Sequence, residues 1–234
     1  MASASDVIFD ALRTAITDGS LNEGEVLRQD HIARMFNTSR IPVREALTRL
    51  EEQGLVTTQR YRGAVVAALS IEEIQEIFEF RALVESEVIH RSVCNISDDA
   101  LKLATSYCDA FSASTEPSKW GDLNRLFHYS LYQECGRPYY LQIVNGALGR
   151  IERYQRVQLT ITNGLERANK EHRAILKACV ARDADLAAEL TRRHILGASR
   201  SLTDFLKEHR GAPHAINAAP AGNATGKPAR RTGR

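Results

Sequence analysis

The sequence predicts a mainly α-helical protein, in which an N-terminal winged helix-turn-helix is followed by an all-α helical bundle. Two short amphipathic helical patterns meet at a tight turn before residue 40, and two β-type runs joined by a glycine-containing turn follow. From residue 70 to about residue 209 only helical periodicity occurs. These observations divide the 234-residue chain into three expected parts, which are residues 1–69, 70–209 and 210–234.

Three helices are expected in the first part, with residues at their ends that helix termini favour. Asp30 is expected to cap the second helix and Ser39 the third, because short polar side chains accept hydrogen bonds from the first helical turn. Pro42 falls in the first turn of the third helix, where its missing N–H costs little. Gly54 stands where a left-handed helix stop is expected. The expected helices span residues 6–17, 30–37 and 40–53.

A β-hairpin is expected after the third helix. Residues 55–59 and 64–68 are β-type runs, and Tyr61-Arg62-Gly63 is the expected turn between them. A hairpin in this place predicts the wing of a winged helix-turn-helix.

The second part is expected to be a bundle of six helices. Short segments with Gly, Pro or Asn interrupt the helical periodicity, and the sequence shows neither a strand pattern nor a repeat. The expected helices lie near residues 71–92, 97–114, 118–135, 138–161, 164–182 and 184–208. Residues 210–234 are rich in Ala, Gly and Pro and contain no aromatic residue, so we expect a disordered basic tail.

Charge is unevenly distributed, although the formal net charge is only +2. Residues 28–62 hold seven Arg against four Asp or Glu, and residues 210–234 hold five Lys or Arg and no acid. Positive charge therefore gathers where a nucleic-acid contact would need it. Because no apolar run could cross a bilayer and no secretion signal is visible, we expect a cytoplasmic protein without membrane contact and with reduced cysteines.

The third helix is suited to reading a DNA major groove. Arg40 and Arg44 lie one turn apart, and the arginine fork matches the O6 and N7 acceptors of guanine. Ser39 at the helix N-terminus can bind a phosphate. The alternative is that Arg44 pairs with Glu45 or Asp30 and that the other arginines form a solvated face. The expected DNA-binding residues are Arg28, Ser39, Arg40, Pro42, Arg44, Arg62 and Gly63.

Three short motifs in this part carry a family resemblance. Residues 39–47 (SRIPVREAL) fit the pattern SRxPVREAL, residues 50–56 (LEEQGLV) fit LxxxGLV, and residues 62–66 (RGAVV) fit RGAxV. With these motifs the segment resembles the winged helix-turn-helix of the GntR regulators. Asn37-Thr38 departs from the usual Gly-Val of that family, although Asn tolerates left-handed geometry. Because a single recognition helix reads only a few base pairs, we expect a homodimer that binds a palindromic operator in double-stranded DNA.

Four polar residues of the expected bundle lie on apolar helix faces. Asn124 and His128 are one turn apart, and His172 and His194 each share the apolar stripe of their own helix. Three imidazoles and an amide oxygen that converge inside a bundle would suit Zn²⁺ or another borderline divalent metal. The alternative is that each histidine is a hydrogen-bonded core residue.

Two further motifs extend the resemblance to the bundle. Residues 127–141 (FHYSLYQECGRPYYL) are similar to FHxxLxxxxGNPYL, and residues 171–176 read EHRAIL. In both respects residues 70–209 resemble the FCD effector domain of the FadR-type GntR branch. The resemblance implies a divalent metal, with Zn²⁺ preferred and Ni²⁺ or Mn²⁺ as alternatives, and a small carboxylate effector. The implied metal ligands are Asn124, which replaces the more common Asp, and His128, His172 and His194.

Arg81 is the candidate residue for direct contact with the effector. It lies seven residues from both Ile74 and Val88 on an apolar stripe, where a charge needs a partner. One alternative is an ion pair with Glu85, and the other is a bidentate contact with a ligand carboxylate. The carboxylate effectors of the resembled family favour the second alternative.

The leading hypothesis is a ligand-responsive transcription regulator that is not an enzyme. Its rivals are a metal-dependent hydrolase fused to a DNA-binding module and a constitutive DNA binder with a purely structural bundle. HExxH is absent, and no acid is evident beside the expected metal ligands as a general base. The sequence leaves open whether the protein represses or activates.

Overall fold

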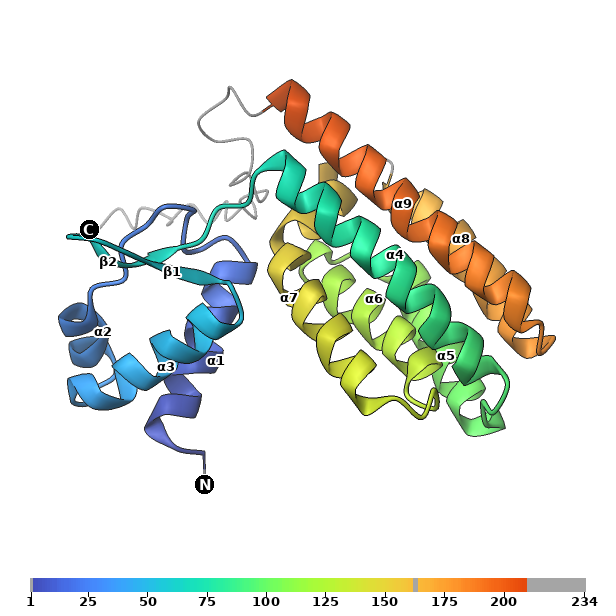
Figure 1. Ribbon diagram of the computed structural model, residues 1–234, viewed down its shortest axis with the longest axis horizontal. Coiled ribbons are helices and arrows are strands. Elements are labelled where there is room, and N and C mark those ends of the chain that lie inside the picture. Colours follow the sequence, from blue (N-terminus) through green and yellow to red (C-terminus); the bar gives the residue numbers. More distant parts are fainter. Residues whose placement is uncertain (1, 162–163, 210–234) are drawn as a thin grey trace, which may run out of the picture.

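The computed structural model describes residues 2–161 and 164–209, and it is mainly helical as predicted (Figure 1). The elements up to residue 66 are α1 (Ala4–Thr17), α2 (Gln29–Met35), α3 (Arg40–Glu52), β1 (Val56–Gln59) and β2 (Gly63–Val66). The following bundle contains α4 (Ile71–Val93), α5 (Asp98–Ala113), α6 (Pro117–Tyr132), α7 (Pro138–Ile161), α8 (Gly164–Val180) and α9 (Ala184–His209). Within the described ranges no helix has the length and apolarity to span a membrane. The expected tail, residues 210–234, lies outside the described residues.

The winged helix-turn-helix is held together by one apolar core and by contacts between α1 and α3. Leu50 and Val43 of α3 are fully buried with Ile8 of α1 in that core. On the surface, Arg49 donates to Asp6 at 2.8 Å, and its guanidinium lies 4.1 Å from the centre of a second α1 side chain, the Phe9 ring. These contacts fix the orientation of α3 relative to α1.

The wing is an antiparallel pair in which Val56 lies opposite Val66 and Gln59 opposite Gly63. Its turn requires positive φ angles, which are 68° at Tyr61 and 77° at Gly63. Glycine adopts such angles without strain, which explains the glycine at the tip of the expected hairpin.

The helix ends agree with most of the sequence-based expectations, but the expected cap of α2 is wrong. The carbonyl of Arg28 already accepts from the N–H groups of His31 and Ile32, so Arg28 is the N-cap. Asp30 therefore lies inside the first turn, where its charge still favours the helix dipole. In α1 the helix begins two residues earlier than expected, because Ser3 and Asp6 form a reciprocal capping box.

The turn between α2 and α3 and the end of α3 follow the expected geometry. Asn37 has φ 48° and Gly54 has φ 69°, both left-handed. Ser39 is the N-cap of α3 as expected, yet its side chain makes no capping hydrogen bond.

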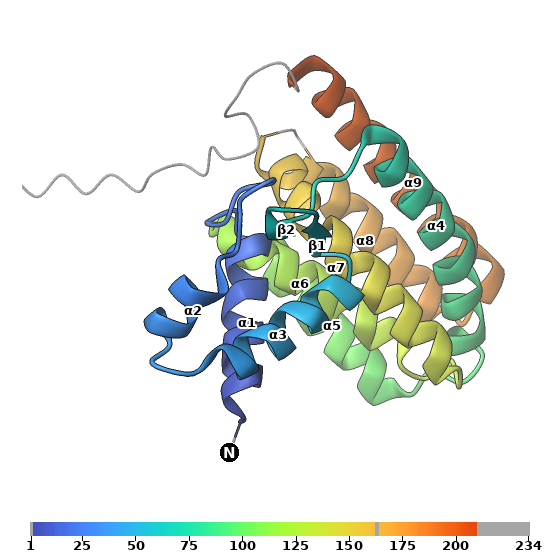
Figure 2. The same cartoon turned by 60° about the vertical axis from the view of Figure 1, so that its left-hand side comes forward.

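The bundle is built around the long antiparallel pair α4 and α9, which lie side by side along their lengths (Figure 1). Phe78 of α4 and Leu202 of α9 are fully buried in the core that they share. A second core, formed by α5, α6 and α8 with the end of α4, includes Phe127 and Ile175. Helix α7 lies on the side of the bundle that faces the winged helix-turn-helix (Figures 1 and 2).

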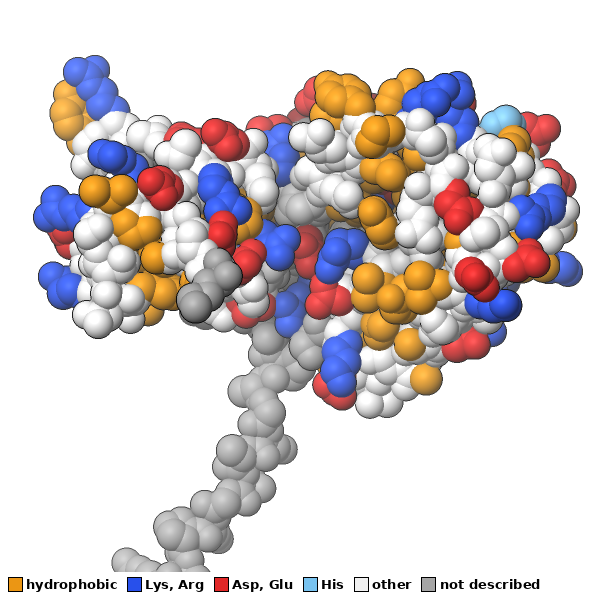
Figure 3. All heavy atoms as spheres, turned by 90° about the horizontal axis from the view of Figure 1, so that it is seen from below, with side chains coloured by type: hydrophobic (Ala, Val, Ile, Leu, Met, Phe, Trp, Pro, Cys, Tyr) orange, Lys and Arg blue, Asp and Glu red, His pale blue; other side chains and the backbone are white. Residues whose placement is uncertain are grey.

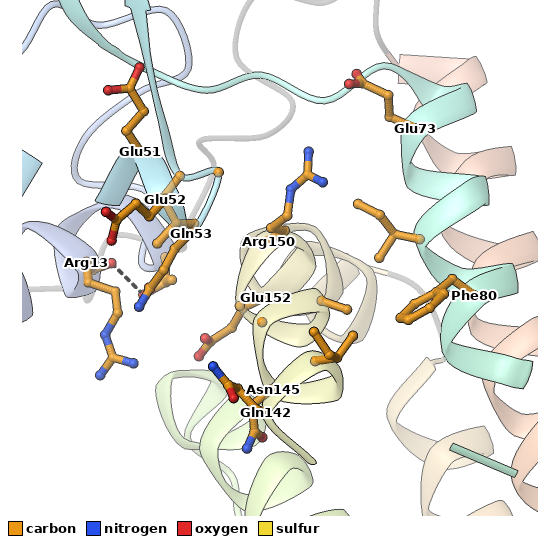
Figure 4. Close-up of a pocket in the computed structure, with 18 of the residues that line it drawn as sticks. Arg13, Glu51, Glu52, Gln53, Glu73, Phe80, Gln142, Asn145, Arg150 and Glu152 are labelled. Atoms are coloured by element: carbon orange, nitrogen blue, oxygen red, sulfur yellow. Dashed lines mark hydrogen bonds between the residues drawn. The ribbon is translucent and has the colours of Figure 1, made fainter. Parts of the chain in front are cut away.

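Helix α7 makes close contact with the winged helix-turn-helix. A Cβ built on Gly54 would lie 2.8 Å from Nε of Arg150, so this glycine allows a close approach as well as a helix stop. Beside this contact lies a cleft of about 1100 Å³ between α3, α4 and α7 (Figure 4). Its walls carry several acidic side chains, among them Glu51, Glu52 and Glu73, together with Arg13 and Arg150.

Candidate metal centre and DNA-binding surface

Three histidines from different helices meet inside the bundle. His128 of α6, His172 of α8 and His194 of α9 are at most 7% exposed. Their ring centres are 4.9 to 5.2 Å apart, and one ring nitrogen from each lies within 4.8 Å of the others. Periodicity on three separate helices predicted that each would face the interior, and the structure brings all three together.

Several nitrogen atoms of this cluster are buried without a hydrogen-bond partner among the described residues. They are Nε2 of His128 and both ring nitrogens of His172, whose ring packs against Phe111 and Phe127. Buried polar atoms in native proteins are nearly always paired, so these atoms require a partner that the described residues do not supply. A divalent metal with a preference for imidazole fits this donor set.

Burial also keeps two of the rings in the form that binds metal. Desolvation lowers the pKa of His128 and of His172 well below the usual value, and repulsion from neighbouring rings lowers both further. Both imidazoles are therefore neutral at physiological pH, as a metal ligand must be.

In His194 and His128, the Nδ1 atom of the ring has a hydrogen-bond partner. Nδ1 of His194 lies 2.7 Å from Oε2 of Glu171, and Nδ1 of His128 lies 3.2 Å from the hydroxyl of Tyr132. That hydroxyl donates to Oε2 of Glu85 at 3.0 Å. Outer contacts of this kind orient metal-binding histidines in many proteins.

An acid does lie beside the histidines, although the sequence made none evident there as a general base. Glu171 precedes His172 in the chain, but its carboxylate contacts His194 because α8 and α9 pack together. Its other oxygen lies 3.7 Å from Nε of Arg167, so the carboxylate is held from two sides. The sequence signal for Tyr132 was its position one turn after His128.

Asn124 and Arg81 are also buried. Asn124, one turn before His128 on α6, is 8% exposed. Arg81 of α4 is 2% exposed and forms the ion pair with Glu85, with Nε donating to Oε1 at 2.6 Å. Its NH1 atom is buried and has no hydrogen-bond partner among the described residues. The ion pair between Arg81 and Glu85, one of the two alternatives from the sequence, thus exists, and it does not use NH1.

Helix α3, which the sequence predicts to read DNA, presents Arg44 and Ser39 to solvent, while its opposite face is buried. Arg40 forms an ion pair with Asp30 of α2. The sequence analysis considered Asp30 as a partner of Arg44, and this pairing is wrong. The turn between α2 and α3 places Arg40, at the start of α3, next to α2, so Arg40 is the residue that reaches Asp30. Pro42 lies in the first turn as expected, and Arg28 is exposed at the N-terminus of α2.

In the wing, Arg62 contacts other protein groups while Tyr61 is exposed, a difference that the sequence did not reveal. Arg62 donates to the carbonyl of Gly24 at 3.2 Å and to Gln59 at 3.0 Å, so it connects the turn end of the wing to the segment between α1 and α2. The outermost side chain is Tyr61, which is 92% exposed and lies 4.9 Å from the Arg60 guanidinium.

Comparison with known families identifies both parts of the chain. Residues 4–66 match the model of the bacterial regulatory proteins of the gntR family, and residues 76–197 match the FCD domain. The chain belongs to the GntR family and carries an FCD domain. The resemblance inferred from the sequence motifs is thereby confirmed.

The relatives of this GntR regulator are transcriptional regulators. It is 29% identical over 198 residues to the HTH-type transcriptional repressor GlaR of Escherichia coli (strain K12), which covers 79% of this chain and 89% of GlaR. It is 28% identical over 202 residues to BphR of Paraburkholderia xenovorans (strain LB400), an HTH-type transcriptional regulator, with 82% of each chain covered.

Solved structures show the same fold. A GntR-family transcriptional regulator from Pseudomonas syringae pv. tomato str. DC3000 is 32% identical, with a TM-score of 0.55 and coverage of 89% of this chain and 88% of the other. E. coli McbR/YncC superposes with a TM-score of 0.76 at 18% identity, covering 88% and 99%.

Proposed function

We propose that this GntR-family regulator changes its affinity for a palindromic operator when a small carboxylate binds beside a divalent metal in the FCD domain. Residues 1–69 would form the DNA-binding domain, and residues 70–209 the effector-binding and dimerisation domain. The observation that carries the proposal is the buried cluster of three histidines, whose unpaired nitrogens need a partner.

The metal would be held by Asn124, His128, His172 and His194. All four ligands are neutral, so a bound ion, Zn²⁺ first and Ni²⁺ or Mn²⁺ as alternatives, would receive no negative charge from its ligands and would attract an anion. The replacement of a carboxylate by the amide of Asn124 favours anionic effectors for the same reason.

The effector would use a second cationic contact. Arg81 already donates to Glu85 from two of its nitrogens, and its unpartnered NH1 remains for a ligand carboxylate. A carboxylate effector is supported by one relative, the gluconate operon transcriptional repressor of Bacillus licheniformis, which is 27% identical over 190 residues. This relative is named for an operon of a carboxylate, and with GlaR it favours repression over activation.

DNA binding would involve a homodimer, because two-fold symmetry matches a palindromic operator. Apolar side chains lie on the surface of the bundle (Figure 3). On α4, Phe80 is 39% and Leu83 is 67% exposed, and on the neighbouring α7, Tyr139 is 68% and Ile143 is 36% exposed. We propose that this α4–α7 face, which includes part of the cleft wall, packs against a second copy.

A direct test begins with an operator selected from random duplex DNA by the purified protein. Affinity for that operator is then measured by fluorescence anisotropy with a panel of small organic acids, each with added Zn²⁺ and with chelator. We expect one or more carboxylates to change the affinity at least tenfold, and only when metal is present. An affinity that no acid changes would instead favour a constitutive DNA binder, and turnover of an ester or amide would favour a hydrolase.

A further inference from the structure

A continuous chain of buried side chains connects the effector arginine to a histidine of the metal centre. Arg81 Nε donates to Glu85 Oε1 at 2.6 Å, and the Tyr132 hydroxyl donates to Glu85 Oε2 at 3.0 Å. The same hydroxyl lies 3.2 Å from Nδ1 of His128. All four side chains are at most 2% exposed, so no solvent competes for these hydrogen bonds.

The directions of these bonds determine the form of the imidazole. A tyrosine hydroxyl has one proton, and Tyr132 gives it to the carboxylate of Glu85, which can only accept. The bond between Tyr132 and His128 must then run from Nδ1–H of the imidazole to the hydroxyl oxygen. The lone pair of His128 is consequently on Nε2, the buried atom without a partner.

His194 reaches the same form by a different route. Glu171 accepts from its Nδ1 at 2.7 Å, so in the neutral ring that binds a metal the lone pair also lies on Nε2. Within residues 2–161 and 164–209, neither nitrogen of His172 has a hydrogen-bond partner, and the ring is held by the rings around it. Two of the three histidines are thus oriented by hydrogen bonds, His128 by Tyr132 of the same helix and His194 by Glu171 of α8.

We propose that Tyr132 and Glu85 are positioning residues that hold His128 in its metal-binding tautomer and couple it to Arg81. The proposal rests on the metal site of the proposed function and adds a physical connection between metal and effector. A carboxylate that draws Arg81 toward itself must pull on Glu85, and Glu85 is shared with Tyr132. Effector binding would therefore change the hydrogen bond that orients His128, although the effector itself does not contact His128.

The sharpest variant is Tyr132→Phe, which keeps the ring in the core and removes only the hydroxyl. Outer-shell substitutions typically weaken metal binding by about 10–100-fold, and we expect a loss in that range for Zn²⁺ and Co²⁺. Affinity is measured by competition with a chromogenic chelator, and Co²⁺ absorption reports the ligand geometry. The matched control is Tyr154→Phe, which removes another buried, hydrogen-bonded hydroxyl from a helix outside the cluster and should leave metal affinity unchanged.

A second readout does not depend on metal. Nitrogen-15 spectra of the metal-depleted protein should show a proton on Nδ1 of His128 in the wild type and a mixture of tautomers in Tyr132→Phe. Glu85→Gln provides a second variant if Tyr132→Phe folds poorly, and it should also mix the tautomers because Gln can donate as well as accept. Wild-type protein that binds no metal would contradict the proposed function and this coupling together. Metal affinity and tautomer left unchanged by Tyr132→Phe and Glu85→Gln, in protein that does bind metal, would overturn the coupling alone.

Discussion

The hydroxyl of Tyr154 in α7 donates a hydrogen bond to Glu23, which lies between α1 and α2 of the winged helix-turn-helix. The same hydroxyl accepts from the backbone N–H of Leu69, in the connection to α4, at 2.9 Å. One side chain of the bundle therefore contacts both the DNA-reading part and the segment that joins the two parts. Because Tyr154 is only 1% exposed, this contact is shielded from water.

We predict that Tyr154→Phe lowers the free energy of unfolding and alters the response of DNA binding to effector. Burial and the Glu23 carboxylate raise the pKa of Tyr154, so the hydroxyl remains a donor throughout the accessible pH range. Loss of its hydrogen bonds should cost about 1–2 kcal/mol, measured by urea denaturation. Operator affinity, with and without effector, is measured in parallel.

Tyr129→Phe is the control for this experiment, since Tyr129 is 42% exposed and should tolerate the loss of its hydroxyl. If Tyr154→Phe and Tyr129→Phe behave alike in both assays, the junction between α7 and the DNA-reading part carries no signal.

The fold was predictable because its signals are local. Helix boundaries followed from caps, glycines and apolar spacing within a few residues, and Gly54 and Asn37 adopt the left-handed angles expected of them. The inward orientation of the histidines was also local, because each belongs to the apolar stripe of one helix.

What the sequence could not supply are contacts between distant elements. Glu85 and Tyr132 are separated by 47 positions, and their hydrogen bond depends on how α4 packs against α6. The pairing of Asp30 with Arg40, rather than Arg44, likewise depends on the angle between α2 and α3. No periodicity within one helix encodes such an angle.

For DNA reading, we predict that Arg44→Ala reduces operator affinity by about 1–3 kcal/mol per half-site and relaxes the base preference. Arg40→Ala should act in the same direction. DNA must displace the ion pair between Arg40 and Asp30, and because this pair is exposed, breaking it costs little free energy. Arg62→Ala should weaken binding evenly across sequences, because Arg62 supports the wing through Gly24.

Competition binding against operators with single base changes separates these effects. Arg193→Ala serves as the control, because this exposed arginine pairs with Glu189 on α9, outside the winged helix-turn-helix. Equal and sequence-independent losses for Arg40→Ala, Arg44→Ala and Arg62→Ala would mean that Arg40 and Arg44 contact only phosphates.

The homodimer is tested at the α4–α7 face. We predict that Leu83→Glu yields a monomer at micromolar concentration, because a charge in an apolar interface must be desolvated without a partner. Multi-angle light scattering gives the mass of each variant. Leu103→Glu on α5, where Leu103 is 41% exposed, should leave the mass of the dimer unchanged. A wild-type monomer, both free and on DNA, would refute the dimer, and a dimeric Leu83→Glu would refute this choice of face.

The cluster of three histidines, which we propose to bind a metal, yields the last prediction, for His172→Ala. Its ring is fully buried and both of its nitrogens lack hydrogen-bond partners among the described residues, so its removal takes away a ligand without breaking a hydrogen bond of the protein. We expect the variant to lose stoichiometric metal and to bind effector weakly, while operator affinity stays close to the wild-type value because the winged helix-turn-helix is a separate part of the chain.

Metal present at 100 times its dissociation constant stabilises the native state by about 2.7 kcal/mol, so chelator should lower the Tm of the wild type and leave that of His172→Ala unchanged. Elemental analysis and calorimetry provide the measurements, and His90→Ala, on an exposed part of α4, provides the control. Stoichiometric metal and a normal effector response in His172→Ala would show that the three histidines are core residues and do not form a metal site.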